Sequence, residues 1–354
     1  MVFGKNKPKI SVILPVYNAG AFIKDSVGSI LNQSVKDFEL IVLDDCSTDN
    51  TLEIIEQFGD PRIVIHRNER NLGLTKTVNI GLQLAESDYI ARMDADDISH
   101  EHRFFFQLRA MEQNPQVCVC GTSYQQIGAG SNKVIRDSGH DNIKGKILLR
   151  APFAHPFVMF RAKFFKQNDI QYDENLPCAQ DYALWLRLAH EYEDCHFENL
   201  LDIFGYYRLH REAISGKNKA IQRKIASSAR IPYLKALCGD VTEREIKIHD
   251  ALYINEYNIL KPEDLISTKI WLLKLRDSNM NSDIYAQHFF NLCLAEKFRD
   301  VCMSCLWLGE WVVKQMTLYP DFNLINVSRE NVKYLKEMAI YINKKMTMHD
   351  TKCA

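Results

Sequence analysis

The 354-residue sequence lacks several features that would place it in other classes of protein. Its formal net charge is -1, so it has no basic excess of the kind that bulk nucleic-acid binding needs, and we expect no nucleic-acid partner. No apolar run approaches the length of a membrane span. The first residues, MVFGKNKPKI, contain no long apolar stretch before a small-residue cleavage site, which argues against a secretory signal. We therefore expect a cytoplasmic protein.

A disulfide framework and a zinc finger are also not expected, although cysteine is plentiful. A long chain without a secretory signal favours reduced thiols. Cys302 and Cys305 have the spacing of half a zinc site, but no second pair of ligands follows at finger spacing and the surrounding pattern is helical. Two buried thiols one helical turn apart are the favoured interpretation. The ten cysteines are Cys46, Cys118, Cys120, Cys178, Cys195, Cys238, Cys293, Cys302, Cys305 and Cys353.

The chain contains an α/β part followed by a helical part. Hydrophobic residues make up 46% and charged residues 25%, which indicates a globular protein long enough for two domains. Apolar runs predict strands at 10–16, 38–43, 62–66, 89–93 and 117–124, with helices at 21–32, 51–58 and 74–86. This alternation predicts an α/β fold with a doubly wound, mostly parallel sheet flanked by helices.

Beyond about residue 215, glycine and proline become rare and helical periodicity dominates. Helices are predicted at 265–275, 286–298, 301–316 and 331–346. We therefore expect an α/β domain over residues 1–215 and a helical C-terminal region over residues 216–354.

Three carboxylates are crowded into the tetrapeptide Asp94-Ala95-Asp96-Asp97, directly after the predicted strand 89–93. At a buried strand end their mutual repulsion is costly unless a cation relieves it. A divalent metal with oxygen ligands does so, and a nucleotide diphosphate would supply the remaining ligands. A solvated acidic turn is the simpler alternative for any such string.

Polar residues also follow the first two predicted strands, at the edge where open parallel sheets bind ligands. Pro15, Tyr17 and Asn18 end the first strand and offer a turn with an aromatic face for a base. Asp45 ends the second strand and could accept a hydrogen bond from the N–H of a uracil. A turn or N-cap role is the alternative for Asp45, and neighbouring Asp44 competes for either role.

A third block joins the strand 62–66 to the following helix. Asn71, Gly73 and Lys76 lie around the helix N-terminus, where backbone N–H groups suit phosphate or carboxylate oxygens. Lys76 could add a positive charge there, although a solvated lysine in a first helical turn is equally ordinary.

Two later segments carry candidate catalytic groups. Asp181 opens the aromatic-rich run 179–185, a rigid place for a general base, although a first-turn aspartate needs no functional reason. Arg208 and His210 stand at i and i+2 of an extended segment, so both project to one side. Arginine suits phosphate and histidine suits metals, but a surface pair at a domain boundary is the alternative. His155 is a further, weaker candidate.

In this order and spacing, the blocks resemble glycosyltransferase family 2, with the GT-A fold. The resemblance covers residues 9 to about 217 and rests on the segments ISVILPVYN, LDDCSTDNT, NLGLTKTVNIGL, YIARMDADDI, AQDYALW and YYRLH, with Ser215. Within the family, the likeness is to bacterial enzymes that extend lipooligosaccharide chains, several of them β-1,3-N-acetylhexosaminyltransferases. It implies an inverting enzyme with a UDP-sugar donor, a glycan or glycolipid acceptor, and Mn²⁺ or Mg²⁺ as cofactor.

The same resemblance implies roles for individual residues. Uridine is assigned to Pro15, Tyr17 and Asp45, ribose or metal to Asp94, metal to Asp96 and His210, the diphosphate to Arg208 and the catalytic base to Asp181. The predicted donor site is completed by Asn18, Asn71, Gly73, Lys76 and Ala95. The sequence departs from the family at Gln180, where a glutamate usually precedes the catalytic aspartate.

Two other functions stay open at this point. A nucleotidyltransferase also combines a doubly wound sheet with paired aspartates, but the sequence lacks the glycine-rich basic loop expected for attack on a triphosphate. A non-catalytic nucleotide-sugar-binding protein would tolerate loss of Asp181 or Asp96. The amphipathic, mildly basic segment 331–346 predicts either a helix packed on its domain or a peripheral contact with the inner face of a membrane.

Overall fold

The computed structural model describes residues 7–210, 219–257, 259–325 and 329–350. The chain divides into two compact units, the first made of residues 1–143 and 151–229 and the second of residues 144–150 and 230–354. The boundary expected after residue 215 falls in 211–218, outside the described residues, as does Ser215. Each unit is described by itself below.

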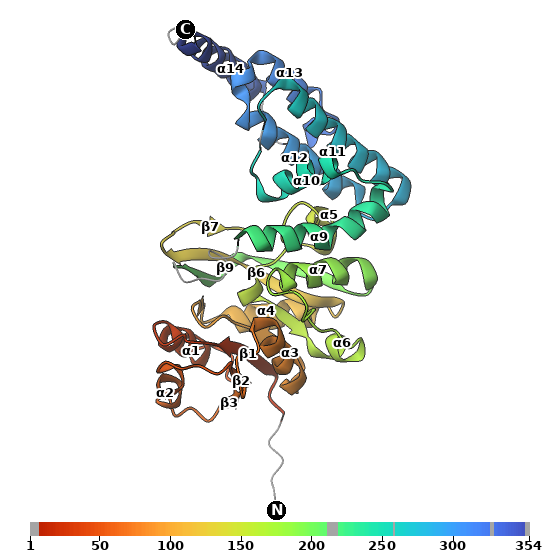
Figure 1. Ribbon diagram of the computed structural model, residues 1–354. Coiled ribbons are helices and arrows are strands. Elements are labelled where there is room, and N and C mark those ends of the chain that lie inside the picture. The colour runs from red at the N-terminus through yellow and green to blue at the C-terminus, as the bar shows by residue number, and fades with distance from the viewer. Residues whose placement is uncertain (1–6, 211–218, 258, 326–328, 351–354) are drawn as a thin grey trace, which may run out of the picture. The chain divides into compact units, whose positions relative to one another are not determined.

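The first unit is built on a nine-stranded mixed sheet (Figure 1). The strand order is β3-β2-β1-β4-β8-β6-β9-β5, with β7 paired to β6, and β1 to β4 form a parallel set. The strands are β1 (Ile10–Val16), β2 (Phe38–Asp44), β3 (Ile63–Arg67), β4 (Tyr89–Arg92), β5 (Ile98–Ser99), β6 (Val117–Gly128), β7 (Lys133–Val134), β8 (Met159–Arg161) and β9 (His196–Leu209).

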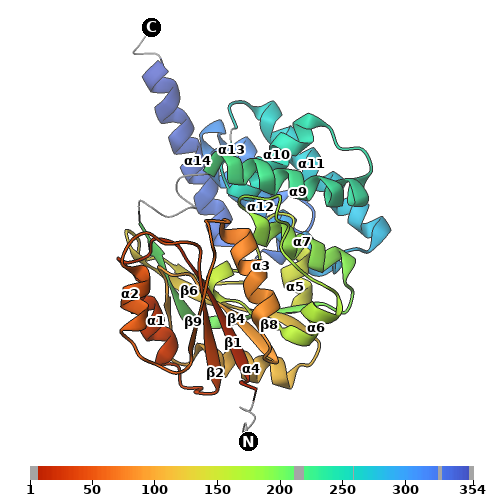
Figure 2. The same ribbon diagram turned by 60° about the horizontal axis from the view of Figure 1, so that its bottom comes forward.

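Helices cover both faces of this sheet. The helices of this unit are α1 (Ile23–Leu31), α2 (Thr51–Glu56), α3 (Leu74–Leu84), α4 (Arg103–Gln113), the first part of α5 (His140–Lys146), α6 (Ala162–Gln167) and α7 (Gln180–Glu191), with a 3₁₀ turn η1 (His155–Phe157). Figure 2 shows β2, β1 and β4 side by side with α3 packed against them. The doubly wound sheet that the alternation predicted is confirmed.

Successive side chains of β1 point to opposite faces of the sheet, so this one strand contributes to the hydrophobic core on both faces. Its residues 10, 12, 14 and 16 belong to a core cluster that includes Val27 of α1 and Phe104 of α4. Ile13 points the other way, towards Gly81 of α3. Because both faces are covered, all seven residues of β1 are buried, which is why the strand is continuously apolar.

The second unit is helical. Its helices include the last nine residues of α9 (Lys219–Cys238), then α10 (Glu243–Ile254), α11 (Pro262–Ser282), α12 (Gln287–Ser304), α13 (Glu310–Thr317) and α14 (Arg329–Asp350), with short 3₁₀ turns η2 (Leu306–Leu308) and η3 (Phe322–Leu324). Among the described residues, none of the helices has both the length and the apolar composition that crossing a membrane requires.

The helix predicted at 301–316 is wrong as a single element. It is divided between the end of α12 and α13, with η2 between them. Gly309 has φ 84° and starts α13 in the left-handed region, a conformation that an unbroken helix cannot contain. Cys302 and Cys305 lie at the end of α12, and both are buried as the thiol interpretation requires.

Candidate active site

The polar strand ends of the first unit gather at one edge of the sheet. β1 pairs in parallel with both β2 and β4, so the residues that follow these strands meet at their carboxyl ends. Asn18, Asp45 and Asp94 each follow one of the three strands. The structure therefore brings together the blocks that the sequence separates by dozens of residues.

The acidic tetrapeptide forms a compact cluster. Asp94, Asp96 and Asp97 each offer one carboxylate oxygen, and these oxygens lie within 4.8 Å of one another. Asp97 is only 1% exposed, and its Oδ2 has no hydrogen-bond partner among the described residues. Burial raises the pKa of Asp97 well above its usual range, and the charges of Asp94 and Asp96 raise it further. A buried, unpartnered oxygen among repelling carboxylates fits a divalent cation.

Arg208 fastens this cluster to the end of β9. Its backbone N–H donates to Asp97 Oδ1 at 2.7 Å, and its Nε donates to the backbone oxygen of Asp96 at 2.8 Å. Its Nη2 pairs with Asp25 at 3.2 Å. The guanidinium is thus held beside the acidic edge, where it can reach a diphosphate.

His210 follows directly after β9 and contacts Asp96, whose backbone oxygen accepts from Arg208. Its Nε2 lies 2.8 Å from Asp96 Oδ2, and its ring lies 4.7 Å from that of Phe22. The i, i+2 spacing therefore does place Arg208 and His210 on one side. Asp96 and His210 are close enough to bind one cation together.

Arg92 is a site residue that the sequence analysis missed. It is the last residue of β4 and only 1% exposed, and its Nη2 pairs with Asp94 Oδ1 at 2.5 Å. Within the described part of the chain, its Nε and Nη1 find no acceptor. A charged residue in an otherwise apolar strand, directly before the acidic run, was the signal that could have found it.

Asp181 stands in the first turn of α7, after Ala179 in the left-handed conformation at φ 53°. Burial raises the pKa of Asp181, whereas the N–H of Tyr182 and the charge of Arg92 lower it. Asp94 also acts on this carboxylate and raises its pKa. Asp181 is therefore electrostatically coupled to the acidic edge. The rival carboxylates Asp173 and Glu174 are exposed.

The loop before Asp181 is held by α3. The Asn79 side chain exchanges two hydrogen bonds with the backbone of Tyr172, both at 2.9 Å, and Thr75 Oγ1 donates to the oxygen of Leu176 at 3.0 Å. Neither Asn79 nor Tyr172 was singled out from the sequence. His155 contributes here, because its Nε2 lies 2.8 Å from the Tyr172 hydroxyl.

Asp45 organises the segment between β3 and α3. Its Oδ1 accepts from the N–H of Leu72 at 2.7 Å and from Asn68 Nδ2 at 2.9 Å, and its Oδ2 accepts from the N–H of Gly73 at 2.8 Å. Gly73 has φ 86° and begins α3. Three of the roughly four acceptor positions of this carboxylate are thus used within the protein.

The remaining predicted donor residues lie in or after β1, between β3 and α3, in α3 and after β4. Asn18, at φ 49°, accepts from the N–H of Thr48 at 2.8 Å and so ties this turn to the segment after β2. Tyr17 is 52% exposed, which leaves its ring free to stack. Pro15 is buried in β1, Asn71 and Lys76 are exposed, and Ala95 is partly buried beside the aspartates.

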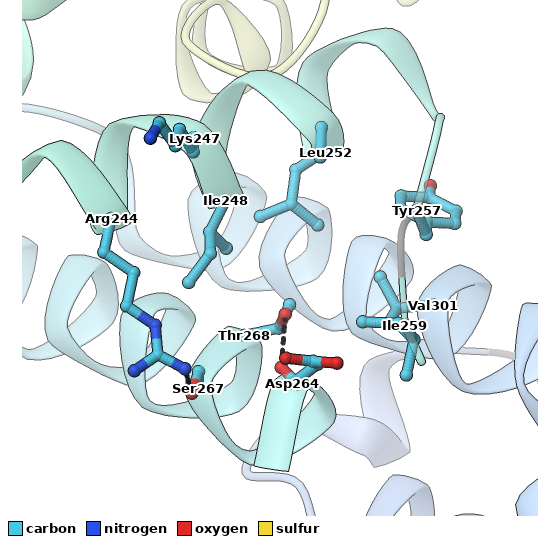
Figure 3. Close-up of a pocket in the computed structure, with 11 residues that line it drawn as sticks. Arg244, Lys247, Ile248, Leu252, Tyr257, Ile259, Asp264, Ser267, Thr268 and Val301 are labelled. Carbon is cyan, nitrogen blue, oxygen red and sulfur yellow. Dashed lines mark hydrogen bonds between the residues drawn. The ribbon is translucent and has the colours of Figure 1, made fainter. Parts of the chain in front are cut away.

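A separate pocket in the second unit is chemically different. It encloses about 180 Å³ between α10, α11 and the residues after α10, and Ile248, Leu252 and Val301 converge in it (Figure 3). Arg244 at its rim bonds Ser267 Oγ at 2.7 Å. The Asp264 carboxylate accepts the N–H groups of residues 260 and 261, so it caps α11. This pocket does not offer the acidic cluster that a metal–diphosphate needs.

Comparison with known proteins decides the family. The model of "Glycosyl transferase family 2" matches residues 11–189, just over half of the chain. The chain belongs to this family. It is therefore a glycosyltransferase, which favours sugar transfer over the nucleotidyl transfer that the sheet and aspartates alone left open.

Individual relatives and solved structures are consistent with this family assignment. An uncharacterized glycosyltransferase of Methanocaldococcus jannaschii is 34% identical over 219 residues, covering 59% of this chain and 73% of the relative. Among solved structures, S. aureus TarS in complex with UDP-GlcNAc has a TM-score of 0.54 at 20% identity, covering 83% of this chain and 89% of that one. The Pyrobaculum calidifontis mannosyltransferase PcManGT, with GDP-Man and Mn²⁺, has a TM-score of 0.53 at 13% identity, covering 90% and 86%. At these identities the two structures show the GT-A fold alone.

Proposed function

We propose that this glycosyltransferase transfers a sugar, with inversion, from a UDP-sugar to a hydroxyl group of a surface glycan such as a lipooligosaccharide. An N-acetylhexosamine is the sugar we favour, because the sequence motifs resemble those of β-1,3-N-acetylhexosaminyltransferases. The observation that carries the proposal is the cluster of Asp94, Asp96 and Asp97, with Arg208 and His210 bonded to it, which supports a site for a cation and a diphosphate.

The donor would lie along the carboxyl edge of β1, β2 and β4. In this proposal the exposed ring of Tyr17 stacks on the uracil, and Pro15 supports it from the end of β1. Asp45 keeps the backbone of Leu72 and Gly73 in place and has one acceptor position left for the base. Asn18, Asn71, Lys76 and Ala95 would line the rest of the donor path.

The diphosphate end would lie at the acidic cluster. Asp96 and His210 would hold Mn²⁺ or Mg²⁺, together with Asp94 or the ribose hydroxyls that Asp94 binds. When bound, the cation neutralises charge on the departing diphosphate. Arg208 would add a second positive charge to the same group, since its guanidinium is fixed beside Asp96.

Asp181 would take the proton of the acceptor hydroxyl as that oxygen attacks the anomeric carbon, on the face opposite the diphosphate. A general base must be fixed in place and largely ionised at the working pH. The left-handed Ala179 and the grip of α3 on the preceding loop provide the first condition. The positive charge of Arg92 provides part of the second, since it opposes the effect of burial on the pKa of Asp181.

The decisive experiment is Asp181→Asn, which keeps size and removes the base. General-base catalysis is worth roughly 10²–10⁴-fold, so kcat should fall at least ~100-fold while the affinity for UDP changes little. Steady-state kinetics with a UDP-sugar panel and calorimetry with UDP measure the two effects. The exposed neighbours provide matched controls, because Asp173→Asn and Glu174→Gln should keep near-native turnover. Near-native turnover in Asp181→Asn would refute the assignment.

We also propose that the second unit serves the acceptor side, with α14 as a peripheral membrane contact. Tyr334 and Tyr341 are exposed on α14, two helical turns apart, and Lys333 is exposed beside them. The intact protein should sediment with anionic vesicles at low salt and be released by high salt. Recovery of all protein in the supernatant at low salt would remove the membrane role and leave the transfer reaction unaffected.

A further inference from the structure

Two thiols from different strands meet at the amino-terminal edge of β6 and β9. Cys118 is the second residue of β6, and Cys195 directly precedes β9. Val117 is opposite His196 whereas Val119 is opposite Phe197, so Cys118 is an extra residue in the ladder, a β-bulge. The Cys118 Sγ donates to the backbone oxygen of Asp194 at 3.7 Å, and Asp194 directly precedes Cys195, so the two cysteines are close neighbours.

The backbone geometry permits a covalent link between them. Neighbouring strands lie about 4.7–4.9 Å apart, within the Cα separation of roughly 4.4–6.8 Å that disulfides span. Cys118 is one residue after, and Cys195 one residue before, the paired residues Val117 and His196, so a disulfide would cross the two strands diagonally and would need a small shift at the bulge. The link would close the chain between residues 118 and 195, the segment that contains α7 and Asp181.

The two thiols are not equivalent, and their difference suits a two-step oxidation. Cys118 lines a cavity of about 330 Å³ together with Arg161, Lys163 and His196. The hydrogen bond from Cys195 lowers the pKa of Cys118 and Arg161 lowers it further, against the effect of burial. Cys195 is fully buried behind it, and its pKa is raised. A small oxidant that enters this cavity thus meets one sulfur, whose pKa is lowered, with a second thiol close by.

We propose that Cys118 and Cys195 are a redox modification site, at which a peroxide converts the two thiols into a disulfide. The Cys118 thiolate attacks one peroxide oxygen, the O–O bond breaks, and the leaving hydroxide takes up a proton to become water. The resulting sulfenic acid is attacked by the Cys195 sulfur, the S–O bond breaks, and a second water leaves with the Cys195 proton. In sum, two thiols and one hydrogen peroxide give one disulfide and two waters.

Cys302 and Cys305 provide an internal comparison. They are equally buried and also close in space, but they lie on one helix end, and Cys305 Sγ donates to the oxygen of Val301 at 3.1 Å. Burial raises the pKa of both thiols, that of Cys305 to about 12. Two neighbouring thiols whose pKa values are both raised should not oxidise rapidly.

The experiment treats the reduced native protein with stoichiometric hydrogen peroxide, blocks remaining thiols with N-ethylmaleimide, and maps peptides without reduction. The expected result is a mass loss of two hydrogens and one linked peptide pair, which contains Cys118 and Cys195. The melting temperature of the oxidised protein should rise by about 4 °C or more and return on addition of dithiothreitol.

Serine variants of single cysteines test whether the disulfide and the thermal shift depend on Cys118 and Cys195. Cys118→Ser and Cys195→Ser should each abolish the linked pair and the thermal shift without changing basal turnover, whereas Cys302→Ser should keep both. The wild-type peptide map needs no variant, so a poorly folded serine variant does not remove the test. The proposal is overturned if Cys302–Cys305 links as fast, or if Cys118 and Cys195 both still take up N-ethylmaleimide after oxidation.

Discussion

The aspartates of the candidate site differ in how many hydrogen bonds their carboxylates already make within the protein. Both oxygens of Asp45 accept hydrogen bonds, from Asn68, Leu72 and Gly73, so this residue largely fixes the loop that ends at α3. One Asp97 oxygen accepts from the N–H of Arg208, and the other is buried and has no partner in the described part of the chain. Both residues are aspartates, so the sequence does not distinguish them. Their hydrogen-bond partners in the structure show that Asp45 mainly holds a loop, whereas Asp97 has an oxygen that is open to a ligand.

The open carboxylates predict a dependence on a divalent cation. Asp96→Ala removes one of the clustered oxygens and the contact with His210, so turnover should fall by at least ~100-fold while the circular dichroism spectrum stays native. UDP should stabilise the wild type against heat much less in excess chelator than in Mn²⁺. Asp60→Ala, which removes an aspartate paired to Arg62 away from the cluster, is the control. Full activity of the wild type in excess chelator would contradict the prediction.

At the scale of single elements, α3 has two structural roles, which different residues of the helix perform. Its apolar side packs on β1 and β2, and its polar residues Thr75 and Asn79 hold the loop before α7. Close packing is possible because residue 81 is glycine. A Cβ there would lie 2.6 Å from Leu43 Cδ1 and 2.7 Å from Ile13 Cγ2. The position of Asp181 thus depends on how closely α3 approaches the sheet.

Gly81→Ala should therefore destabilise the protein, by about 1–2 kcal/mol, although alanine is the better helix former. Gly28, in the middle of α1, is the matched control. A Cβ there would meet only Phe58 at 4.0 Å, so Gly28→Ala should stabilise by about 0.5–1 kcal/mol. Urea denaturation followed by circular dichroism measures both changes. Equal effects of the two substitutions would show that close packing of α3 does not govern stability.

At the scale of the whole molecule, the fold alone does not select the donor base. One structural neighbour was solved with UDP-GlcNAc and another with GDP-Man and Mn²⁺, at similar TM-scores. In the proposed function, side chains at the strand ends, including Tyr17 and Asp45, provide the selectivity for the base. The presence of two compact units also means that a ligand of the first unit need not stabilise the second.

We expect UDP to raise the melting temperature more than GDP or CDP at equal concentration. A ligand present at 100 times its Kd stabilises the state that binds it by about 2.7 kcal/mol, and a base that fits poorly contributes less. Differential scanning calorimetry in Mn²⁺ measures the shift. If two transitions are resolved, only the one that belongs to the first unit should move. Equal shifts for the three nucleotides would remove the uridine assignment.

The sequence by itself determined what depends on neighbours along the chain. The period-two and period-3.6 patterns of apolar residues predicted β1 to β4 and α1 to α3 to within two residues at most ends. The tetrapeptide 94–97 and the i, i+2 pair of Arg208 and His210 were visible for the same reason. Short elements whose partners are distant, such as β5 and β8, carry too little local pattern and were missed.

Only the tertiary structure decided which of these groups form one site. Arg208 and Asp96 are 112 residues apart and Asn79 and Tyr172 are 93 apart, yet each pair is joined by hydrogen bonds. Arg92 was hidden because an arginine in a strand reveals its role only through the acids around it. Local patterns follow from backbone periodicity, whereas a binding site is made by non-local contacts, and these exist only once the sheet has brought its strand ends together.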